Sequence, residues 1–493
     1  MARLSSRWFR IPAATSFAAL LLIASACSND ANARAINATA GGDSTSGEGK
    51  PDTRIEWKAC TGAETGNRCA DVTVPLDYDE PDGDTITLGV TLAKATGNRI
   101  GPLFINPGGP GSTADDLVAQ LSHFLPDEII QRFDIVGVDP RGTGASKLDC
   151  GFDMTELFGT DPYVDDAKER EALVDVNEDY TDACRDEVGD LLPHMGTRDA
   201  ARDIDRIREL LGDEKMSYLG MSYGTILGQV YAAEFPDRVR AMVLDASVPL
   251  GPTGIELATT QAAGFETALE AFAKDCNAKA DCPIAPDAID SIDKLLARTE
   301  KEPIPAKPRD LGPGEVATGL SLPLYSQDMW PDLAKAVAAG LKGDGSPMVK
   351  LADTYLGEVD FDLYYAVNCI DFEWPSSTRK FITAADTAGE TDTHFGQPEV
   401  NQYLECATWP VDQDPLEASS QPISPRPLVI ATTGDPATPY DYGKQTAEQT
   451  GGLLLTHLGE GHTSVGEGDE CIDPIVAAYL VDGKLPADGT TCD

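Results

Sequence analysis

The sequence predicts an α/β fold in which a mostly parallel central sheet carries an inserted helical cap. Short apolar runs alternate with stretches of helical spacing, which is typical of a parallel sheet covered by helices. Glycine-rich or polar motifs follow several of these runs, at the strand ends where such sheets place their chemistry. The alternation lapses between Pro249 and about Tyr365 and then returns, which indicates an insertion into one discontinuous domain.

The first expected element is an antiparallel hairpin. Residues 69–77 and 85–95 alternate apolar and polar side chains around a turn-forming segment, Glu80 to Asp84. The strands that we expect in the parallel part of the sheet are the apolar runs 102–106, 133–139, 216–219, 241–244, 427–431 and 453–458. Residues 254–276 and 287–301 have helical spacing, so we expect the cap to be helical.

These patterns divide the 493 residues into five expected segments. They are a signal peptide (1–26), a flexible linker (27–53), the first part of the α/β core (54–249), the helical cap (250–365) and the C-terminal part of the core (366–493). The linker is expected because Ser28 to Lys50 has almost no large apolar side chain to bury.

The amino terminus has the features of an export signal. Three arginines flank or precede an apolar run from Ile11 to Ala26, which is too short to span a membrane comfortably. The segment Ala24-Ser25-Ala26-Cys27 satisfies the small-residue cleavage rule and also resembles a bacterial lipobox, although Ala24 stands where that motif prefers leucine. We therefore expect a protein that is secreted, or anchored to the outer face of the bacterial cell membrane through a lipid on Cys27.

The charge balance excludes one class of partner. The chain has 82 acidic and 38 basic residues and a formal net charge of −44. Such a field repels phosphate backbones, so we expect no nucleic-acid partner. A solubilising acidic surface accounts for the charge, and no catalytic meaning follows from it.

The cysteines predict disulfides. Of the 11 cysteines, Cys27 lies in the signal region, and the rest form an even set suited to an oxidising compartment. Sequence alone does not fix connectivity, but short separations suggest Cys60 with Cys69, Cys276 with Cys282, Cys369 with Cys406 and Cys471 with Cys492, which leaves Cys150 with Cys184. A metal site would need paired cysteines or histidines at ligand spacing, and neither occurs, so we expect no metal and no cofactor.

A candidate nucleophile lies between an apolar run and a helical pattern. Residues 220–224 read Gly-Met-Ser-Tyr-Gly, the G-x-S-x-G pattern that exposes a serine on a sharp turn between strand and helix. The alternative is an ordinary glycine-rich turn, but the strand before it and the helix after it are the required context. We therefore take Ser222 as the candidate nucleophile.

A serine nucleophile needs a histidine base, which is itself held by a carboxylate. In the α/β-hydrolase arrangement both follow the serine in the chain, each in a loop after a strand. His462 and Asp435 meet this requirement. The rival base His457 lies within a strand pattern, where its side chain would point into a sheet face. The rival acid is Asp245, directly after the expected strand 241–244.

Backbone amides that could stabilise an oxyanion are also predicted. Tyr223 follows the nucleophile at the start of a helix, so its amide is free to donate. Gly109 lies in the turn Asn106-Pro107-Gly108-Gly109-Pro110-Gly111, where a side chain would obstruct the substrate. The alternative for this turn is a plain loop that ends a strand. A second motif, residues 139–146, lacks the lysine of a phosphate-binding loop, and we interpret it as structural.

With these residues in place, the chain resembles the secreted actinobacterial tripeptidyl aminopeptidases and related exported α/β-hydrolases of the prolyl-aminopeptidase superfamily. The matching stretches are Val74 to Tyr78, Asn106 to Gly111, Asp139 to Gly142, Tyr218 to Thr225, Gly434 to Pro439 and Gly461 to Ser464. The resemblance implies an α/β-hydrolase fold and the removal of short peptides from free amino termini. Some look-alikes act chiefly on esters.

The resemblance also implies that the cap helps to bind the substrate ammonium group. Asp371 or Glu373 could meet it, although solvated or structurally paired carboxylates are the alternative. The family's Val-Leu-Asp-Gly is here Val-Leu-Asp-Ala at 243–246, which leaves the triad untouched. We thus expect a serine exopeptidase with a peptide substrate and no obligate protein partner; the alternatives are a carboxylesterase or thioesterase with the same triad, and a non-catalytic binding lipoprotein.

Overall fold

The computed structural model describes residues 55–60 and 66–493, and Ile55–Asp493 form one compact unit. The expected signal peptide (1–26), the linker (27–53) and Cys27 lie outside the described residues. Within the described part of the chain, no helix combines the length and apolar character needed to cross a membrane.

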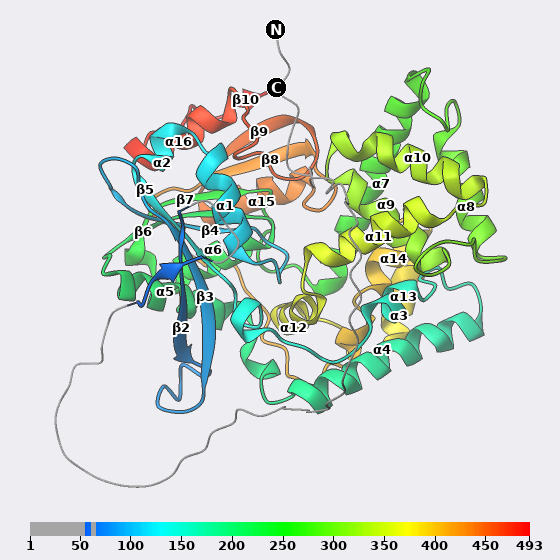
Figure 1. Cartoon of the computed structure of the whole chain (residues 1–493), viewed down its shortest axis with the longest axis horizontal. Helices are drawn as coiled ribbons and strands as arrows, with labels where there is room; N and C mark the ends of the chain where they lie inside the picture. Colours follow the sequence, from blue (N-terminus) through cyan, green and yellow to red (C-terminus); the bar gives the residue numbers. More distant parts are fainter. Residues whose placement is uncertain (1–54, 61–65) are drawn as a thin grey trace, which may run out of the picture. The chain divides into compact units, whose positions relative to one another are not determined.

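The described strands form one sheet (Figure 1), in the order β1-β2-β3-β5-β4-β6-β7-β8-β9-β10. Their bounds are β1 Lys58–Ala59, β2 Arg68–Pro75, β3 Thr85–Ala93, β4 Gly101–Asn106, β5 Phe133–Val138, β6 Met216–Met221, β7 Val239–Asp245, β8 Leu428–Gly434, β9 Leu453–Glu460 and β10 Thr491–Cys492. The pairs β1–β2, β2–β3 and β3–β5 are antiparallel, and the remaining pairs are parallel. The predicted fold class, the predicted hairpin and each predicted strand are therefore confirmed.

Strands β8 and β9 run further than the apolar runs that predicted them. Their pairing continues through Thr432 with His457 and ends at Gly434 with Glu460, after a register shift between Thr432 and Gly434. Because backbone hydrogen bonds hold the ladder, polar side chains can extend a strand beyond its apolar part. The irregularity comes directly before Asp435, and such irregularities commonly redirect the next side chain.

Helices cover the sheet and fill the insertion between β7 and β8. The helices outside the insertion are α1 Ala114–Phe124, α2 Asp127–Ile130, α3 Met154–Gly159, α4 Ala167–Val188, α5 Thr197–Leu211, α6 Tyr223–Glu234, α15 Tyr440–Thr450 and α16 Ile472–Asp482. The insertion contains α7 Gly254–Ala278, α8 Ala288–Thr299, α9 Pro313–Leu324, α10 Trp330–Leu341, α11 Ser346–Glu358, α12 Phe361–Asp371, α13 Thr378–Gly389 and α14 Gly396–Asn401. In Figure 1 these helices gather beside the sheet, with α3 and α4 among them.

Buried apolar side chains form two clusters. The first joins sheet residues such as Val72 and Leu244 to Tyr365 on α12. The second consists mainly of side chains from α7 to α11, such as Phe265 and Leu333. The chain thus rejoins the apolar cluster of the sheet within α12. The expected end of the cap at residue 365 stays a prediction, because the described chain forms a single unit.

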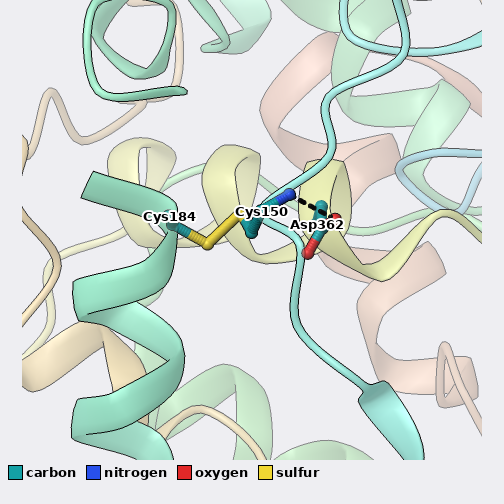
Figure 2. Close-up of side chains that lie close together, drawn as sticks. All are labelled: Cys150, Cys184 and Asp362. Carbon is teal, nitrogen blue, oxygen red and sulfur yellow. Dashed lines mark hydrogen bonds between the residues drawn. A yellow bond between two sulfur atoms is a disulfide. The ribbon is translucent and has the colours of Figure 1, made fainter. Parts of the chain in front are cut away.

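A disulfide and a carboxylate tie α4 and α12 to the loop after β5 (Figure 2). Cys150 in this loop is bonded to Cys184 on α4, and the Cys150 amide donates to Asp362 Oδ2 on α12 at 3.0 Å. The Tyr180 hydroxyl donates to the other Asp362 oxygen, also at 3.0 Å. Although two cysteines and a carboxylate converge here, their sulfurs are bonded to each other, and only a thiolate is a metal ligand.

The remaining predicted disulfides are also formed. They are Cys60–Cys69, Cys276–Cys282, Cys369–Cys406 and Cys471–Cys492. Each closes a short loop, which limits the freedom of the unfolded chain locally.

Candidate active site

Ser222 lies on a strained turn between β6 and α6. Its backbone has φ 54° and ψ −126°, which a residue with a side chain rarely adopts. The flanking residues must be glycines, because a side chain at either position would collide with backbone atoms. A Cβ on Gly220 would lie 2.3 Å from the Gly224 carbonyl oxygen, and one on Gly224 would lie 2.7 Å from that of Asn106. This is the geometry that the G-x-S-x-G pattern predicts.

The order of the strands brings the candidate residues to one edge of the sheet. β6, β7, β8 and β9 are consecutive neighbours and run parallel. Ser222 follows β6, Asp435 follows β8 and His462 follows β9. Asp435 and His462 follow adjacent strands, which lie about 4.8 Å apart, whereas β6 and β9 are three strands apart. The loop after β9 reaches back toward Ser222, because the amides of Ser464 and Ser222 both donate to Asp245 at the end of β7.

Asp435 holds the His462 imidazole with both carboxylate oxygens. Nδ1 of His462 lies 2.9 Å from Oδ1 and 3.0 Å from Oδ2. An ionised carboxylate only accepts, so the proton of the neutral ring is on Nδ1 and Nε2 is free to act as a base. The carboxylate is itself fixed, because Oδ1 accepts the amides of Ala437 and Thr438 at 3.0 and 2.9 Å.

This environment alters the basicity of the imidazole. Burial by itself lowers the pKa of His462, but the charge and hydrogen bond of Asp435 and the charge of Asp245 outweigh burial. The net effect raises the pKa of His462 above its usual value of 6.5. A general base with a pKa near the working pH transfers protons efficiently.

Asp245, the rival acid, has a different position. Its Oδ2 accepts the amides of Ser464 and Val465 at 2.8 and 2.9 Å, and its main-chain carbonyl accepts the Ser222 amide at 3.0 Å. Burial raises the pKa of Asp245 to about 6. In the described part of the chain it makes no hydrogen bond to His462, so the geometry favours Asp435 as the acid. Asp245 instead links the serine turn to the histidine loop.

The rival base His457 lies within β9, as the sequence predicts. Its Nδ1 faces the hydroxyls of Thr432 and Ser464 at 3.2 and 3.1 Å, and burial lowers its pKa. Among the described residues, no hydrogen bond joins the Ser222 hydroxyl to either histidine. Catalytic hydrogen bonds are often long or poorly aligned before substrate binds, so the open contact does not exclude His462 as the base.

The turn after β4 lies against the nucleophile. A Cβ on Gly108 would lie 2.8 Å from the Ser222 Cβ and 3.3 Å from the Tyr223 nitrogen. The Gly108 amide donates to Asn106 Oδ1 at 3.0 Å and is therefore used within the turn. The amides of Gly109 and Tyr223 donate to no acceptor in the described part of the chain, which leaves both available to a substrate oxygen.

The structure adds two residues to the site that the sequence motifs did not identify. Thr438 donates its hydroxyl to Asp435 Oδ2 at 2.9 Å, and only its position three residues after the acid hints at this turn. Tyr325, directly after α9, packs edge-on against the His462 ring with 5.2 Å between ring centroids. Its carbonyl accepts the His462 amide at 3.0 Å. The inserted helices thus contribute directly to the site.

Among the described residues, no hydrogen bond joins Asp371 or Glu373 directly to Ser222, His462 or Asp435. The Asp371 carboxylate accepts the Thr197 hydroxyl and amide, and Thr197 Oγ1 lies 2.7 Å from the Tyr223 hydroxyl. Asp371 is 2% exposed, and burial raises its pKa to about 7. Thr197 thus donates to both carboxylate oxygens, and contact of Asp371 with a substrate ammonium stays a prediction. Glu373 is exposed, and no contact among the described residues links it to the triad residues.

The motif at 139–146 has a structural role, in agreement with its interpretation from sequence. Arg141 is 1% exposed and donates from Nε and Nη2 to the two Asp203 oxygens, each at 2.8 Å. It also donates to the carbonyls of Leu76 and His194 at 2.9 Å. The guanidinium thus ties the end of the hairpin to α5.

Comparison with known proteins places this chain in a family. Residues 392–492 match the family model described as TAP-like protein. The serine protease Hip1 of Mycobacterium tuberculosis is 35% identical over 487 residues, which cover 92% of this chain and 93% of Hip1. Carboxylesterase B of the same organism is 33% identical over 467 residues, covering 88% of this chain and 89% of the esterase.

The tripeptidyl aminopeptidase of Streptomyces lividans is 31% identical over 478 residues, which cover 89% of this chain and 86% of that enzyme. Relatives with these names match nearly the whole chain. The chain is an enzyme, a serine hydrolase, and it belongs to the tripeptidyl aminopeptidase-like family of the α/β-hydrolase superfamily.

Proposed function

We propose that this enzyme is an exopeptidase that releases short peptides, tripeptides in particular, from free amino termini. Ser222 is the nucleophile, His462 the general base and Asp435 the acid that orients it. The observation that carries this assignment is the Asp435–His462 hydrogen bond at the sheet edge where the Ser222 turn lies. The aminopeptidase and protease names of its relatives support a peptide substrate.

The reaction follows from the roles of these groups. Nε2 of His462 accepts the Ser222 hydroxyl proton as Oγ attacks the peptide carbonyl carbon. The tetrahedral intermediate collapses when the imidazolium gives this proton to the leaving amine, and an ester of Ser222 remains. Water, deprotonated by His462, then attacks the ester and releases the short peptide. Asp435 keeps the ring in the required tautomer throughout.

The oxyanion needs donors that are in place before the reaction. The amides of Tyr223 and Gly109 are the proposed pair, because neither is used within the described structure. Removing one preorganised donor from such a hole costs roughly 3 kcal/mol of transition-state stabilisation. The positive φ of Gly109, 99°, also disfavours any side chain at this position.

A carboxylesterase is the second candidate. The relative named carboxylesterase B, at 33% identity, favours it. The same triad hydrolyses esters, whose leaving groups depart more easily than amines, so the catalytic residues do not distinguish the two functions. The distinction depends on how the enzyme binds the remainder of the substrate.

We also propose that the protein is exported and carries a lipid on Cys27, which would anchor it to the outer face of the membrane. The apolar run from Ile11 to Ala26 and the residues before Cys27 support this proposal. The paired cysteines fit an oxidising compartment. Mass spectrometry of the mature amino terminus tests it: a diacylglyceryl cysteine supports anchoring, and an unmodified start near residue 27 contradicts it.

A product profile from a mixed peptide library tests the peptidase assignment. Release of fragments of uniform length from free amino termini is expected. Aminoacyl and tripeptidyl amides are assayed beside short acyl esters. Rapid turnover of esters with no amide cleavage would replace the peptidase assignment with the esterase.

A further inference from the structure

The side chain of Tyr223 is held by a buried chain of hydrogen bonds. Its hydroxyl lies 2.7 Å from Thr197 Oγ1, and the Thr197 hydroxyl donates to Asp371 Oδ2. An ionised carboxylate only accepts, so the single hydroxyl hydrogen of Thr197 goes to Asp371, and Tyr223 donates to Thr197. Tyr223, Thr197 and Asp371 are 6%, 0% and 2% exposed, so bulk water does not compete for these bonds.

This chain of hydrogen bonds joins three helices that are far apart in the sequence. Thr197 is the first residue of α5, Tyr223 is the first of α6, and Asp371 is the last of α12. The two oxygens of Asp371 also accept the Thr197 amide, each at 3.2 Å. The helix α5 has no side-chain cap from its own N-cap residue, and a carboxylate of the inserted region takes that role. The helix dipole favours a negative charge at this end.

Gly196, the N-cap residue of α5, leaves room for this carboxylate. A Cβ at position 196 would lie 3.2 Å from Asp371 Oδ1 and 3.2 Å from Ile370 Cγ2. A side chain that capped α5 from within its own segment would therefore crowd α12. The start of α5 thus takes its cap from α12, and this cap also fixes the hydroxyl that receives Tyr223.

The peptide group between Ser222 and Tyr223 carries one of the amides that we assign to the oxyanion hole. Its carbonyl oxygen accepts the amide and the hydroxyl of Thr225 at 2.9 and 2.6 Å. Because a peptide group is planar, these bonds set the direction of the Tyr223 N–H. The strained backbone of Ser222 persists only where neighbouring contacts hold it, and the anchored Tyr223 side chain is one such contact.

We propose that Asp371 and Thr197 are positioning residues that act on the oxyanion hole through the side chain of Tyr223. A donor stabilises the developing oxyanion when it lies within about 3 Å of it and is held there before the reaction. The buried chain of hydrogen bonds supplies this rigidity. The inference rests on the proposed function, since it takes Ser222 as the nucleophile and the Tyr223 amide as an oxyanion donor.

The test measures hydrolysis of a short acyl 4-nitrophenyl ester at about pH 8. Burial raises the pKa of Asp371 to about 7, so its carboxyl is mostly ionised at this pH. The ester has no ammonium group, so a contact of Asp371 with a substrate amine cannot contribute. In Tyr223→Phe, kcat is expected to fall about 5- to 50-fold, less than the roughly 10²- to 10³-fold loss when an oxyanion donor is removed outright. KM should change less than about twofold, because the oxyanion forms only in the transition state.

Tyr231→Phe is the matched control. Tyr231 lies about two turns further along α6, is 0% exposed and donates its hydroxyl to Asp205 on α5 at 3.0 Å. This variant loses the same kind of bond between the same two helices, away from the serine turn. Its kcat should stay within about twofold of the wild type. Equal losses in the two variants would overturn the proposal, and so would a wild-type kcat in Tyr223→Phe.

Variants of the other two residues test whether the chain acts as one unit. Thr197→Ser keeps the hydroxyl and should keep kcat within about twofold, whereas Thr197→Val and Asp371→Ala should each lose about as much as Tyr223→Phe. Combining Thr197→Val with Tyr223→Phe should lower kcat no more than about twofold further, because both changes remove the same bond. Losses that multiply would refute a shared path. If the Val and Ala variants do not fold, Thr197→Ser and Tyr223→Phe decide.

An aryl trifluoromethyl ketone distinguishes a weakened oxyanion hole from a general loss of structure. When Ser222 Oγ adds to its carbonyl carbon, the carbonyl oxygen becomes an anion and the serine proton passes to His462. The inhibition constant should rise in Tyr223→Phe by about the factor by which kcat falls, because the adduct resembles the transition state. In Tyr231→Phe it should stay within about twofold of the wild type. A reduced kcat in Tyr223→Phe beside an unchanged inhibition constant would contradict the proposal.

A failure of the proposed function gives a different result. Ester hydrolysis by the wild type that is lost in Ser222→Ala establishes the nucleophile before the other variants are compared. If the wild type neither hydrolyses the ester nor is inhibited by the ketone, the proposed function fails, and this inference fails with it. If the wild type does both and Tyr223→Phe matches it, the positioning role alone is refuted.

Discussion

Asp245 holds Ser222 with its main chain and the loop after His462 with its side chain. Its carbonyl accepts the Ser222 amide at 3.0 Å, and its Oδ2 accepts the amides of Ser464 and Val465. One residue at the end of β7 thus fixes the relative positions of two segments that lie more than 200 residues apart in the chain. Because the residue is 0% exposed, substrate does not compete for these bonds.

Asp245→Asn is therefore expected to keep most activity. An asparagine can retain the oxygen that accepts both amides, and its NH₂ would occupy the position of Oδ1, which has no partner in the described structure. kcat/KM should fall less than about 10-fold. Asp435→Asn should instead reduce kcat by about 10⁴-fold, because an amide donor imposes the wrong imidazole tautomer.

Steady-state kinetics of both variants on one substrate checks this prediction, with circular dichroism as the control for folding. The reverse result, an inactive Asp245→Asn beside a nearly active Asp435→Asn, would make Asp245 the catalytic acid.

Ser222→Ala is expected to abolish turnover while the fold is retained. Loss of a serine nucleophile in a triad costs on the order of 10⁶-fold in kcat. The hydroxyl makes no hydrogen bond within the described structure, so its removal should change the melting temperature by less than about 2 °C. A fluorophosphonate probe should label the wild type and not the variant. Labelling at another residue would contradict the assignment.

The local motifs could predict the candidate site residues because each motif depends on neighbours in the sequence. Ser222 was predictable from Gly220 and Gly224, which leave room for its turn, and His462 and Asp435 from the apolar strands before them. Parallel sheets place their chemistry at the carboxyl ends of the strands, and the observed order puts β6, β8 and β9 within four consecutive strands.

The contributions of the inserted helices were not predictable in this way. Tyr325 packs against His462 although 137 residues separate them in the sequence (462 − 325). Helical periodicity shows which side chains are buried but not which helix faces them. The contact between Thr197 and Asp371, the last residue of α12, was likewise not predictable, because the two residues lie far apart in the sequence.

Thr438→Val should reduce kcat about 10- to 100-fold with little change in KM. The hydroxyl donates to Asp435 Oδ2 at 2.9 Å, and valine leaves that oxygen without this donor and free to turn from Nδ1. Thr433→Val is the matched control, because Thr433 is exposed two residues before Asp435 and bonds only to Gly459 of β9 in the described structure. Equal losses in both variants would show a general effect of the loop.

The pH dependence of ester hydrolysis should report His462. The imidazole must be neutral to accept the serine proton, so kcat/KM is lost as the pH falls through its pKa. Burial lowers this pKa, but Asp435 and Asp245 raise it above 6.5 on balance. The acidic limb should therefore have a midpoint above 6.5. A neutral ester is the substrate of choice, since it does not titrate. A midpoint well below 6.5 would contradict the electrostatic environment described here.

His394 should make the stability of the inserted helices depend on pH. Nδ1 lies 2.6 Å from Glu266 Oε1 on α7 and Nε2 lies 2.9 Å from Asp293 Oδ1 on α8, and the histidine is 5% exposed. Burial lowers the pKa of His394, but the hydrogen bonds and charges of Glu266 and Asp293 have the larger effect and raise it above 6.5. The folded state holds the His394 proton more tightly than the unfolded chain does. The charged ring therefore contributes fully to the free energy of unfolding below about pH 6.5, and this contribution is lost as the pH rises through the raised pKa.

Thermal unfolding of the wild type and His394→Gln between pH 5 and 9 measures this contribution. At low pH the melting temperature of the wild type should exceed that of His394→Gln by about 1 to 3 °C, and this difference should shrink as the pH rises. Asp392, whose pKa burial raises, is present in both proteins, and no hydrogen bond joins it to His394 in the described structure. Burial raises the pKa of Glu266, but the hydrogen bonds and charge of His394 lower it on balance, so the difference between the two curves reports the pairing of His394 with its carboxylates. A difference that grows with pH would mean that the buried imidazole is neutral, and that Glu266 and Asp293 do not hold a charged ring.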